Sequence, residues 1–256
     1  MSIRKKILEE INSVRTNPSG YVDKILKYKD YFKGKILYIP GEKVGIQTNE
    51  GAPAYEEAAN YLKTAKNNEA FIPSKGLTNI ANDYLNKVID VGMDKIDDID
   101  MNDIIDEYGS FTKQFNQLLE LGSTTAEQIV ISLLVSDGDS TREYRKHLLS
   151  PNLKKIGIAS KKDNTNKNLT IIVASTDFKN KDDSDDKENF EENEEERKKR
   201  EEAQKREKEE KKIKEKAEKT ILLDQKKDKN LNTMTLIGII LLILLLLLLF
   251  YKLSGH

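Results

Sequence analysis

The sequence ends in an unbroken apolar run, MTLIGIILLILLLLLLFY, from Met234 to Tyr251. As a helix of about 18 residues this run would be roughly 27 Å long, the minimum needed to cross a bilayer. A buried core helix is the alternative, but it would need a protein shell that the rest of the chain does not supply. We therefore expect a single C-terminal transmembrane helix over residues 234–251, followed by a short tail over 252–256.

The N-terminal sequence MSIRKKILEEINSVRTNP is amphipathic and lacks the uninterrupted apolar stretch of a signal peptide. Together with the short C-terminal tail, this predicts a tail-anchored, single-pass membrane protein. Its N-terminal domain would face the cytosol, on the endoplasmic reticulum or the mitochondrial outer membrane. Attachment through a GPI anchor also uses an apolar C-terminus, but the absence of an entry signal and the position of Lys252 argue against it.

The segment before the apolar run is dominated by Glu, Lys and Arg. Over residues 191–230, Glu repeatedly precedes a cation by four positions, as in Glu194/Lys198, and such pairs stabilise an isolated helix. A coiled coil is disfavoured because the few apolar residues do not recur at heptad positions a and d. We expect a charged helical spacer here, with a disordered tether as the alternative, preceded by an acidic disordered linker over 179–190.

Composition limits the chemistry open to the remaining domain, residues 1–178. The chain has no cysteine, which excludes disulfides, Cys-ligated zinc and a thiol nucleophile. His147 and His256 are its two histidines, so few of the imidazole groups that zinc sites and serine triads usually need are available. The formal net charge of −1 gives no reason to expect a nucleic-acid partner.

Hydrophobic periodicity predicts that this domain is α+β. Ile3, Ile7, Leu8, Ile11 and Val14 fall on one face of an N-terminal helix. Two β-rich stretches, 155–159 and 169–175, are joined by the polar turn KKDNTNKN.

The ordered set of motifs resembles the CAP superfamily, also called SCP/TAPS or PR-1-like, in its cysteine-free form. The resemblance spans nearly all of residues 3–178. The matching elements are Asn12, Arg15 and Pro18 in the opening helix, the helices in TNEGAPAYEEAANYLK and GLTNIANDYLNKVIDVG, the helix 129–135, the turn Asp137–Gly138, the signature Arg142/Tyr144/Arg145/Leu148, Pro151, and the strand Gly157–Ile158–Ala159. The resemblance implies an α–β–α sandwich with a cleft that many members line with two histidines and two acidic residues. Members are reported to bind divalent metals, sterols, lipids or proteins there.

Carried over position by position, the resemblance puts Tyr84 and Tyr144 in the two histidine positions and Gln117 in a glutamate position. A phenol with a pKa near 10 and a neutral amide ligate a divalent ion poorly. We therefore expect a degenerate cleft of Tyr84, Gln117 and Tyr144, with no catalytic residues, no metal and no cofactor. This cleft is either an ordinary polar patch or a ligand pocket of altered specificity.

Two other features leave alternatives open. His147 follows Tyr144 by about one helical turn and could replace a missing histidine, although packing or solvent exposure is the simpler reading. Asp137 and Asp139 flank Gly138 in a pattern that faintly suggests a calcium loop, but a capped turn explains it better.

These observations predict a membrane-tethered, non-catalytic binding module that presents a CAP-like domain to an unknown protein or lipid partner. The alternatives are a metal-assisted hydrolase and a sterol- or lipid-binding protein. The sequence leaves open whether the chain is an enzyme, and the exchanged cleft residues favour the view that it is not.

Overall fold

The computed structural model describes residues 1–42, 44–181, 190 and 238–244. The helices are α1 (Ile3–Thr16), η1 (Ser19–Tyr21), α2 (Val22–Lys29), α3 (Ala52–Thr64), α4 (Lys75–Val91), η2 (Met93–Asp98), α5 (Met101–Tyr108), α6 (Ala126–Val135) and α7 (Glu143–Leu148). The strands are β1 (Phe32–Lys33), β2 (Ile36–Leu37), β3 (Ile46–Gln47), β4 (Ile72–Pro73), β5 (Gly109–Ser110), β6 (Phe115–Leu121), β7 (Lys155–Lys162), β8 (Asn168–Ser175) and β9 (Lys179–Asn180). The chain divides into two compact units, residues 1–191 and 192–256.

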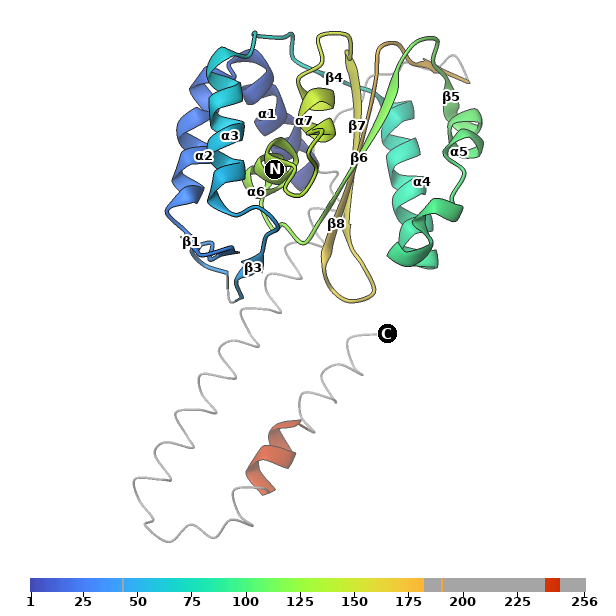
Figure 1. The fold of residues 1–256 in the computed structure, drawn as a ribbon. Coiled ribbons are helices and arrows are strands. Elements are labelled where there is room, and N and C mark those ends of the chain that lie inside the picture. The colour runs from blue at the N-terminus through green and yellow to red at the C-terminus, as the bar shows by residue number, and fades with distance from the viewer. Residues whose placement is uncertain (43, 182–189, 191–237, 245–256) are drawn as a thin grey trace, which may run out of the picture. The chain divides into compact units, whose positions relative to one another are not determined.

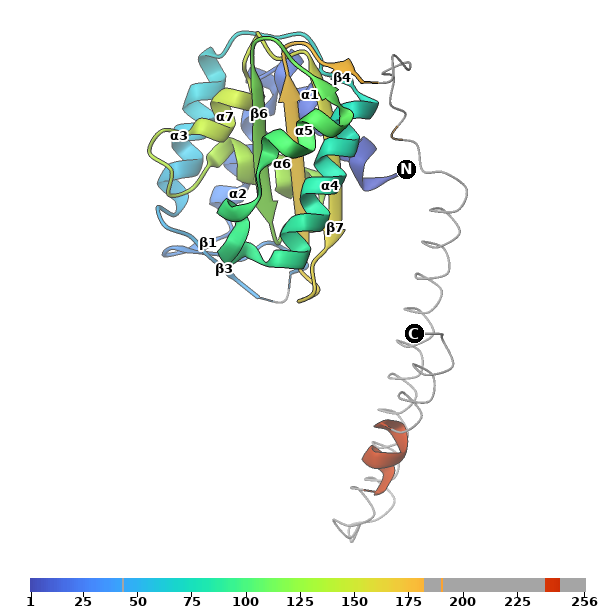
Figure 2. The ribbon, with the colours of Figure 1, turned by 90° about the vertical axis from the view of Figure 1, so that its right-hand side faces the viewer.

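A four-stranded sheet forms the centre of the first unit, in the order β4-β7-β8-β6. β4 runs parallel to β7, whereas β7 with β8 and β8 with β6 are antiparallel. In Figure 1, α4 and α5 lie on one side of this sheet and α1, α2, α3, α6 and α7 on the other. Figure 2 shows the long strands behind α4 and α5 after a quarter turn.

Alternation along the strands separates two cores. Ile156, Ile158 and Leu118 belong to the core on the α1 and α6 side. Ala159 and Val173 belong to the core under α4. Successive strand residues point to opposite faces, so each strand contributes to both cores.

Sequence features explain where the helices begin. α1 starts at Ser2, whose side chain accepts a hydrogen bond from the Lys5 backbone N–H. α6 starts with a capping box, in which Thr125 and Gln128 satisfy each other's backbone N–H groups. The predicted N-terminal helix is confirmed, and its residues Ile7, Ile11 and Val14 are buried. The predicted pair of strands is also confirmed, as the antiparallel hairpin of β7 and β8.

Two residues of the opening helix fasten it to distant segments. Asn12 exchanges two hydrogen bonds with the backbone of Phe71, from Nδ2 to its carbonyl at 3.2 Å and from its N–H to Oδ1 at 2.7 Å. Arg15 is fully buried and donates to the carbonyls of Glu69, Leu148, Ser150 and Leu153. These motif residues therefore hold the fold together.

The last described residues of the first unit also pack onto it. β9 pairs with β5, and Lys181 donates its backbone N–H to the carbonyl of Tyr108. Phe190 is buried beside α1, where the Ser2 hydroxyl donates to its carbonyl and Arg4 lies over its ring. The segment predicted as an acidic linker, 179–190, thus has its two ends on the domain, and residues 182–189 lie outside the described part.

The fold class predicted from the sequence is wrong, although the structure does place helices on both faces of one sheet. That prediction was an α+β, CAP-like α–β–α sandwich followed by a long charged helix and a single C-terminal transmembrane helix. The described residues instead form a mixed α/β fold, because helices alternate with strands and β4 pairs in parallel with β7.

A second finding concerns the C-terminal part of that prediction, the transmembrane helix. Within 234–251, the structure describes residues 238–244, which are helical. None of the helices in the described part of the chain combines the length and apolar composition that a membrane span requires. The predicted spacer, 191–230, lies outside the described residues, and the tail-anchored location stays a prediction.

Candidate functional site

The structure does not bring the three predicted cleft residues together. Tyr84 lies on α4 and is buried in the core beneath that helix. Gln117 lies on β6 between Phe115 and Leu119, which face the same core. Tyr144 lies on α7 and packs against the core on the other face of the sheet. The sheet therefore separates Tyr144 from Tyr84, and these residues do not form one cleft.

His147 instead contacts Asn116, the residue before Gln117. The Asn116 amide donates to His147 Nε2 at 2.7 Å, if the ring is taken as the neutral tautomer with its hydrogen on Nδ1. Burial lowers the pKa of His147, while the nearby Glu143 acts in the opposite direction. Among the residues that the structure describes, no three His, Cys, Asp or Glu side chains converge in a group that could hold a metal ion.

The residues of the SDGDS segment form a capped turn. Asp137 accepts hydrogen bonds from the backbone N–H groups of Asn49 and Glu50, at 2.6 and 2.9 Å. Asp139 accepts from the N–H groups of Thr141 and Glu143, both at 2.8 Å, which confirms the capping interpretation. This segment connects α6 to α7 and uses its carboxylates structurally.

The Arg142 side chain ties this turn to the start of α3. Its Nη1 and Nη2 donate to the two carboxylate oxygens of Glu50, each at 2.6 Å, and its Nε donates to Glu57 at 3.2 Å. Arg145, almost fully buried, also donates to Glu57 and lies over the Tyr61 ring. The arginines of the predicted signature thus join α7 to α3.

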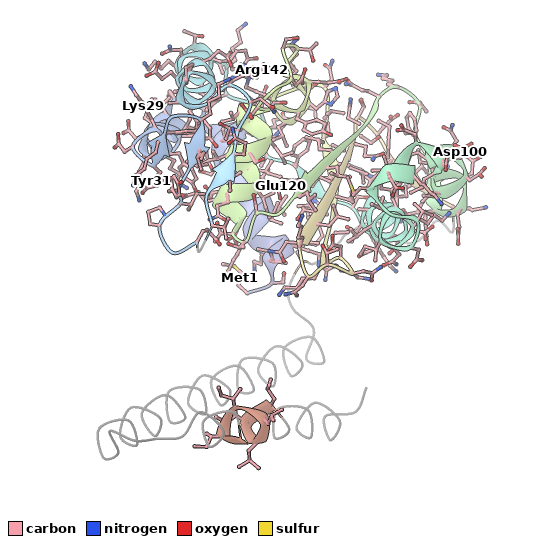
Figure 3. All side chains as sticks on the ribbon, turned by 60° about the horizontal axis from the view of Figure 1, so that its bottom comes forward. Met1, Lys29, Tyr31, Asp100, Glu120 and Arg142 are labelled. Atoms are coloured by element: carbon pink, nitrogen blue, oxygen red, sulfur yellow. The ribbon has the colours of Figure 1, made fainter. Side chains whose placement is uncertain are left out.

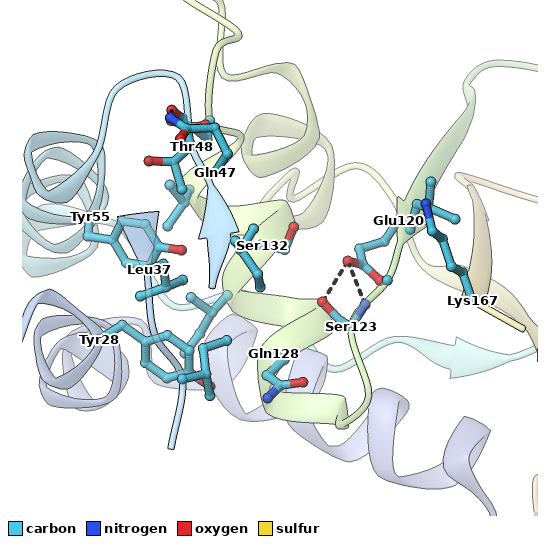
Figure 4. Close-up of a pocket in the computed structure, with 17 residues that line it drawn as sticks. Tyr28, Leu37, Gln47, Thr48, Tyr55, Glu120, Ser123, Gln128, Ser132 and Lys167 are labelled. Atoms are coloured by element: carbon cyan, nitrogen blue, oxygen red, sulfur yellow. Dashed lines mark hydrogen bonds between the residues drawn. The ribbon is translucent and has the colours of Figure 1, made fainter. Parts of the chain in front are cut away.

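A pocket of about 350 Å³ opens on the α6 side of the sheet. Its walls come from α2, α3, the small β2–β3 sheet, the end of β6, α6 and the turn between β7 and β8 (Figure 4). Apolar side chains such as Leu37, Ile39 and Ile131 line it together with polar groups of Gln47, Thr48, Gln128 and Ser132. This mixture of apolar walls and a few polar groups is typical of small-molecule sites.

Glu120 is the acidic side chain in the wall of this pocket that is most deeply buried, at 5% exposure. It extends from β6 toward α6 (Figure 4), and Figure 3 shows it among the side chains at the centre of the domain. Its Oε1 accepts from the Ser123 hydroxyl at 2.6 Å and from the Ser123 N–H at 3.3 Å. Its Oε2 is buried and has no hydrogen-bond partner in the described part of the chain.

Burial raises the pKa of the Glu120 carboxyl, and the hydrogen bonds from Ser123 oppose this shift without cancelling it. A desolvated carboxylate without a cation is costly, which is why burial shifts the titration of Glu120 toward the neutral acid. Neutral, it offers one O–H donor; ionised, it is a strong acceptor. An ionisable group whose pKa is shifted by burial, and which lies in a pocket, is a candidate functional residue.

Two tyrosines form the wall contributed by α2 and α3 (Figure 4). The rings of Tyr28 and Tyr55 are stacked, with centroids 6.2 Å apart and planes inclined by 13°. The Tyr28 hydroxyl donates to Glu127 at 3.2 Å, whereas the Tyr55 hydroxyl forms no hydrogen bond with any described residue. Burial raises the pKa of both phenols, so both remain protonated at neutral pH.

Sequence reasoning missed this pocket, although one signal was present. In the strand FNQLLEL, Glu120 shares the inward-facing side with Leu118, so a charged residue occupies a core position. The tyrosine wall had no comparable signal, because Tyr28 and Tyr55 read as ordinary apolar positions of amphipathic helices.

Comparison with known proteins adds little. No protein-family model matches the chain, and no curated protein matches it. Among solved structures, it is similar to an outer surface protein from Borrelia burgdorferi, at 16% sequence identity and a TM-score of 0.35. That match covers 48% of this chain and 88% of the other. A likeness this weak supports no conclusion, and the resemblance to the CAP superfamily stays a prediction.

Proposed function

We propose that the folded domain is a non-catalytic binding module that holds a small organic molecule in the pocket around Glu120. The observation that carries this proposal is the buried carboxyl of Glu120, which has an unpartnered Oε2 and belongs to a side chain in the wall of a cavity of about 350 Å³. Buried polar atoms are nearly always hydrogen-bonded, so an unpartnered one on a residue that lines a pocket points to a missing partner. The apolar and aromatic walls would bury the body of such a molecule.

The residues first expected to bind a ligand support this proposal less well. Tyr84 and Tyr144 contribute to separate cores, whereas the residues around Glu120 share one cavity. The proposal keeps the binding role predicted from the sequence and moves it to a different site.

Binding can be tested with 1-hexanol, a neutral amphiphile, using saturation-transfer NMR on the full chain. Ser132 lines the pocket and is exposed, so the Ser132→Phe variant would fill space there without entering the core. Ser13 on α1 is also an exposed helical serine but does not line the pocket, which makes Ser13→Phe the matched control.

We expect saturation transfer to hexanol with the wild-type chain and with Ser13→Phe, and its loss with Ser132→Phe. Equal transfer in both variants would mean that hexanol binds elsewhere. That result would refute the proposed function.

A further inference from the structure

The carboxyl group of Glu120 lacks a cationic partner in the part of the chain that the structure describes. Ser123 satisfies Oε1, while Oε2 is sealed from solvent without a partner. None of the salt bridges among the described residues includes Glu120. A carboxylate in such surroundings becomes stable when a cation reaches it, since the pair then compensates for the lost hydration.

Other charged groups near the pocket do not supply that cation. Lys167 lines the pocket, but it forms no salt bridge with Glu120 among the described residues, and it is not among the causes of the shifted pKa of the Glu120 carboxyl. Asp137 also lines the pocket and accepts from two backbone N–H groups. At the neighbouring positions, Glu127 accepts from Tyr28, and Glu42 accepts from Thr124. The carboxyl groups outnumber the ammonium group, so the local field favours a positive ligand.

The tyrosine wall suits the same kind of molecule. The Tyr28 and Tyr55 rings present apolar surface, and aromatic faces attract cations as well as hydrocarbon chains. The Tyr55 hydroxyl, which has no partner among the described residues, adds a hydrogen-bonding group.

We propose that the ligand of this pocket is an organic ammonium compound, whose nitrogen pairs with the Glu120 carboxylate once that side chain turns Oε2 toward the cavity, while its hydrocarbon part lies against the apolar and tyrosine walls. This inference rests on the proposed function, because it names the class of ligand that the same pocket takes.

Binding of an ammonium ion would change the protonation state of the Glu120 carboxyl. Because burial raises the pKa of Glu120, more of the empty pockets carry the neutral acid at a given pH than would be so for an exposed glutamate. Arrival of the ammonium ion, R–NH₃⁺, favours the carboxylate, so the carboxyl proton leaves to solvent and the N–H groups donate to the carboxylate. The total charge is conserved, with one cation bound and one proton released from each pocket that was neutral.

The test compares three molecules with the same hydrocarbon chain: hexylammonium, 1-hexanol and hexanoate. Calorimetry on the full chain should show hexylammonium binding at least about tenfold more tightly than hexanol, and hexanoate not binding. Glu120→Gln retains the shape of the side chain and removes its charge. We expect this variant to weaken hexylammonium about tenfold while leaving hexanol unchanged. Repeating the wild-type titration in two buffers of different ionisation enthalpy should reveal proton release with hexylammonium and none with hexanol.

The outcomes separate the two proposals. Equal affinities for hexanol and hexylammonium, with no proton release, would overturn the ammonium assignment but leave the binding module in place. Failure of all three molecules to bind would overturn both. If Glu120→Gln does not fold, the wild-type selectivity and proton release still decide the question, because neither needs a variant.

Discussion

The guanidinium of Arg15 lies over the ring of Phe71, with its carbon 3.7 Å from the ring centroid. The same group donates to the carbonyls of Glu69 before β4 and of Leu148 and Leu153 around the end of α7. Burial lowers the pKa of Arg15 to about 10, so it stays charged at neutral pH. One side chain therefore connects α1 to two segments far away in the sequence.

Replacing Arg15 should destabilise the domain strongly. Arg15→Met keeps much of the volume but leaves several buried carbonyls without donors, and we expect a loss of about 3–5 kcal/mol in the free energy of unfolding. Urea denaturation measures this loss. Lys6→Met on the exposed face of α1 is the control and should change stability by less than about 0.5 kcal/mol. A small effect at Arg15 would contradict its role in the fold.

Gly157 allows α4 to approach β7. A Cβ atom at this position would lie 2.1 Å from the carbonyl carbon of Leu77, a backbone contact that no rotamer change relieves. We expect Gly157→Ala to cost about 1–3 kcal/mol or to prevent folding. Thermal unfolding checks this, with Lys162→Ala as an exposed control on the same strand. Equal stability of the two variants would show that α4 does not sit this closely on the sheet.

The Glu50–Arg142 pair should make stability fall in acid. The hydrogen bonds from Arg142 and Gly138 lower the pKa of Glu50 to about 2. Since the folded-state pKa is depressed, the contribution is present above the ordinary value near 4.3 and is lost as pH falls toward about 2. Glu50 is more than a third exposed, so solvent screening limits the contribution to about 1 kcal/mol.

Glu50→Gln should therefore be less stable than the wild type at neutral pH and equally stable near the folded-state pKa. Denaturant titrations across acid pH measure the difference between the two chains. A difference that stays constant with pH would argue against ionisation of Glu50 as its source.

Glu120 should have the opposite pH dependence. Because its folded-state pKa is raised, its contribution to stability is full below the ordinary value and is lost as pH rises through the folded-state pKa. Glu120→Gln removes this titration, so the variant should gain stability relative to the wild type as pH increases. Unfolding curves of both chains over that range measure the gain, and parallel pH profiles would contradict a raised pKa.

The local elements of the domain could be predicted from periodicity and turn chemistry. The apolar positions of 3–16 gave the first helix, and the polar turn after 162 gave the β7–β8 hairpin. The parallel pairing of Ile72 with Lys155 could not be predicted, because β4 has two residues and no apolar alternation. Long-range pairing of so short a strand depends on tertiary packing rather than on local pattern.

The candidate site was harder to predict than the fold. Counting positions along a motif placed Tyr84, Gln117 and Tyr144 in one cleft, but such counting does not say which face of the sheet each residue occupies. Tyr144 packs on one core and Tyr84 on the other. Glu120 does line a pocket, but predicting this requires knowing which face of the sheet each residue of β6 occupies. A register shift of one residue would turn every side chain of the strand to the opposite face.

The contact between Ser2 and Phe190 brings the start of the folded domain and its last described residue together beside α1. A short designed linker between these two positions could therefore close the polypeptide into a ring. New ends could then be opened in the exposed turn of residues 163–167, giving a circular permutant that keeps the same sheet order. Such a permutant would allow the domain to be studied without residues 191–256.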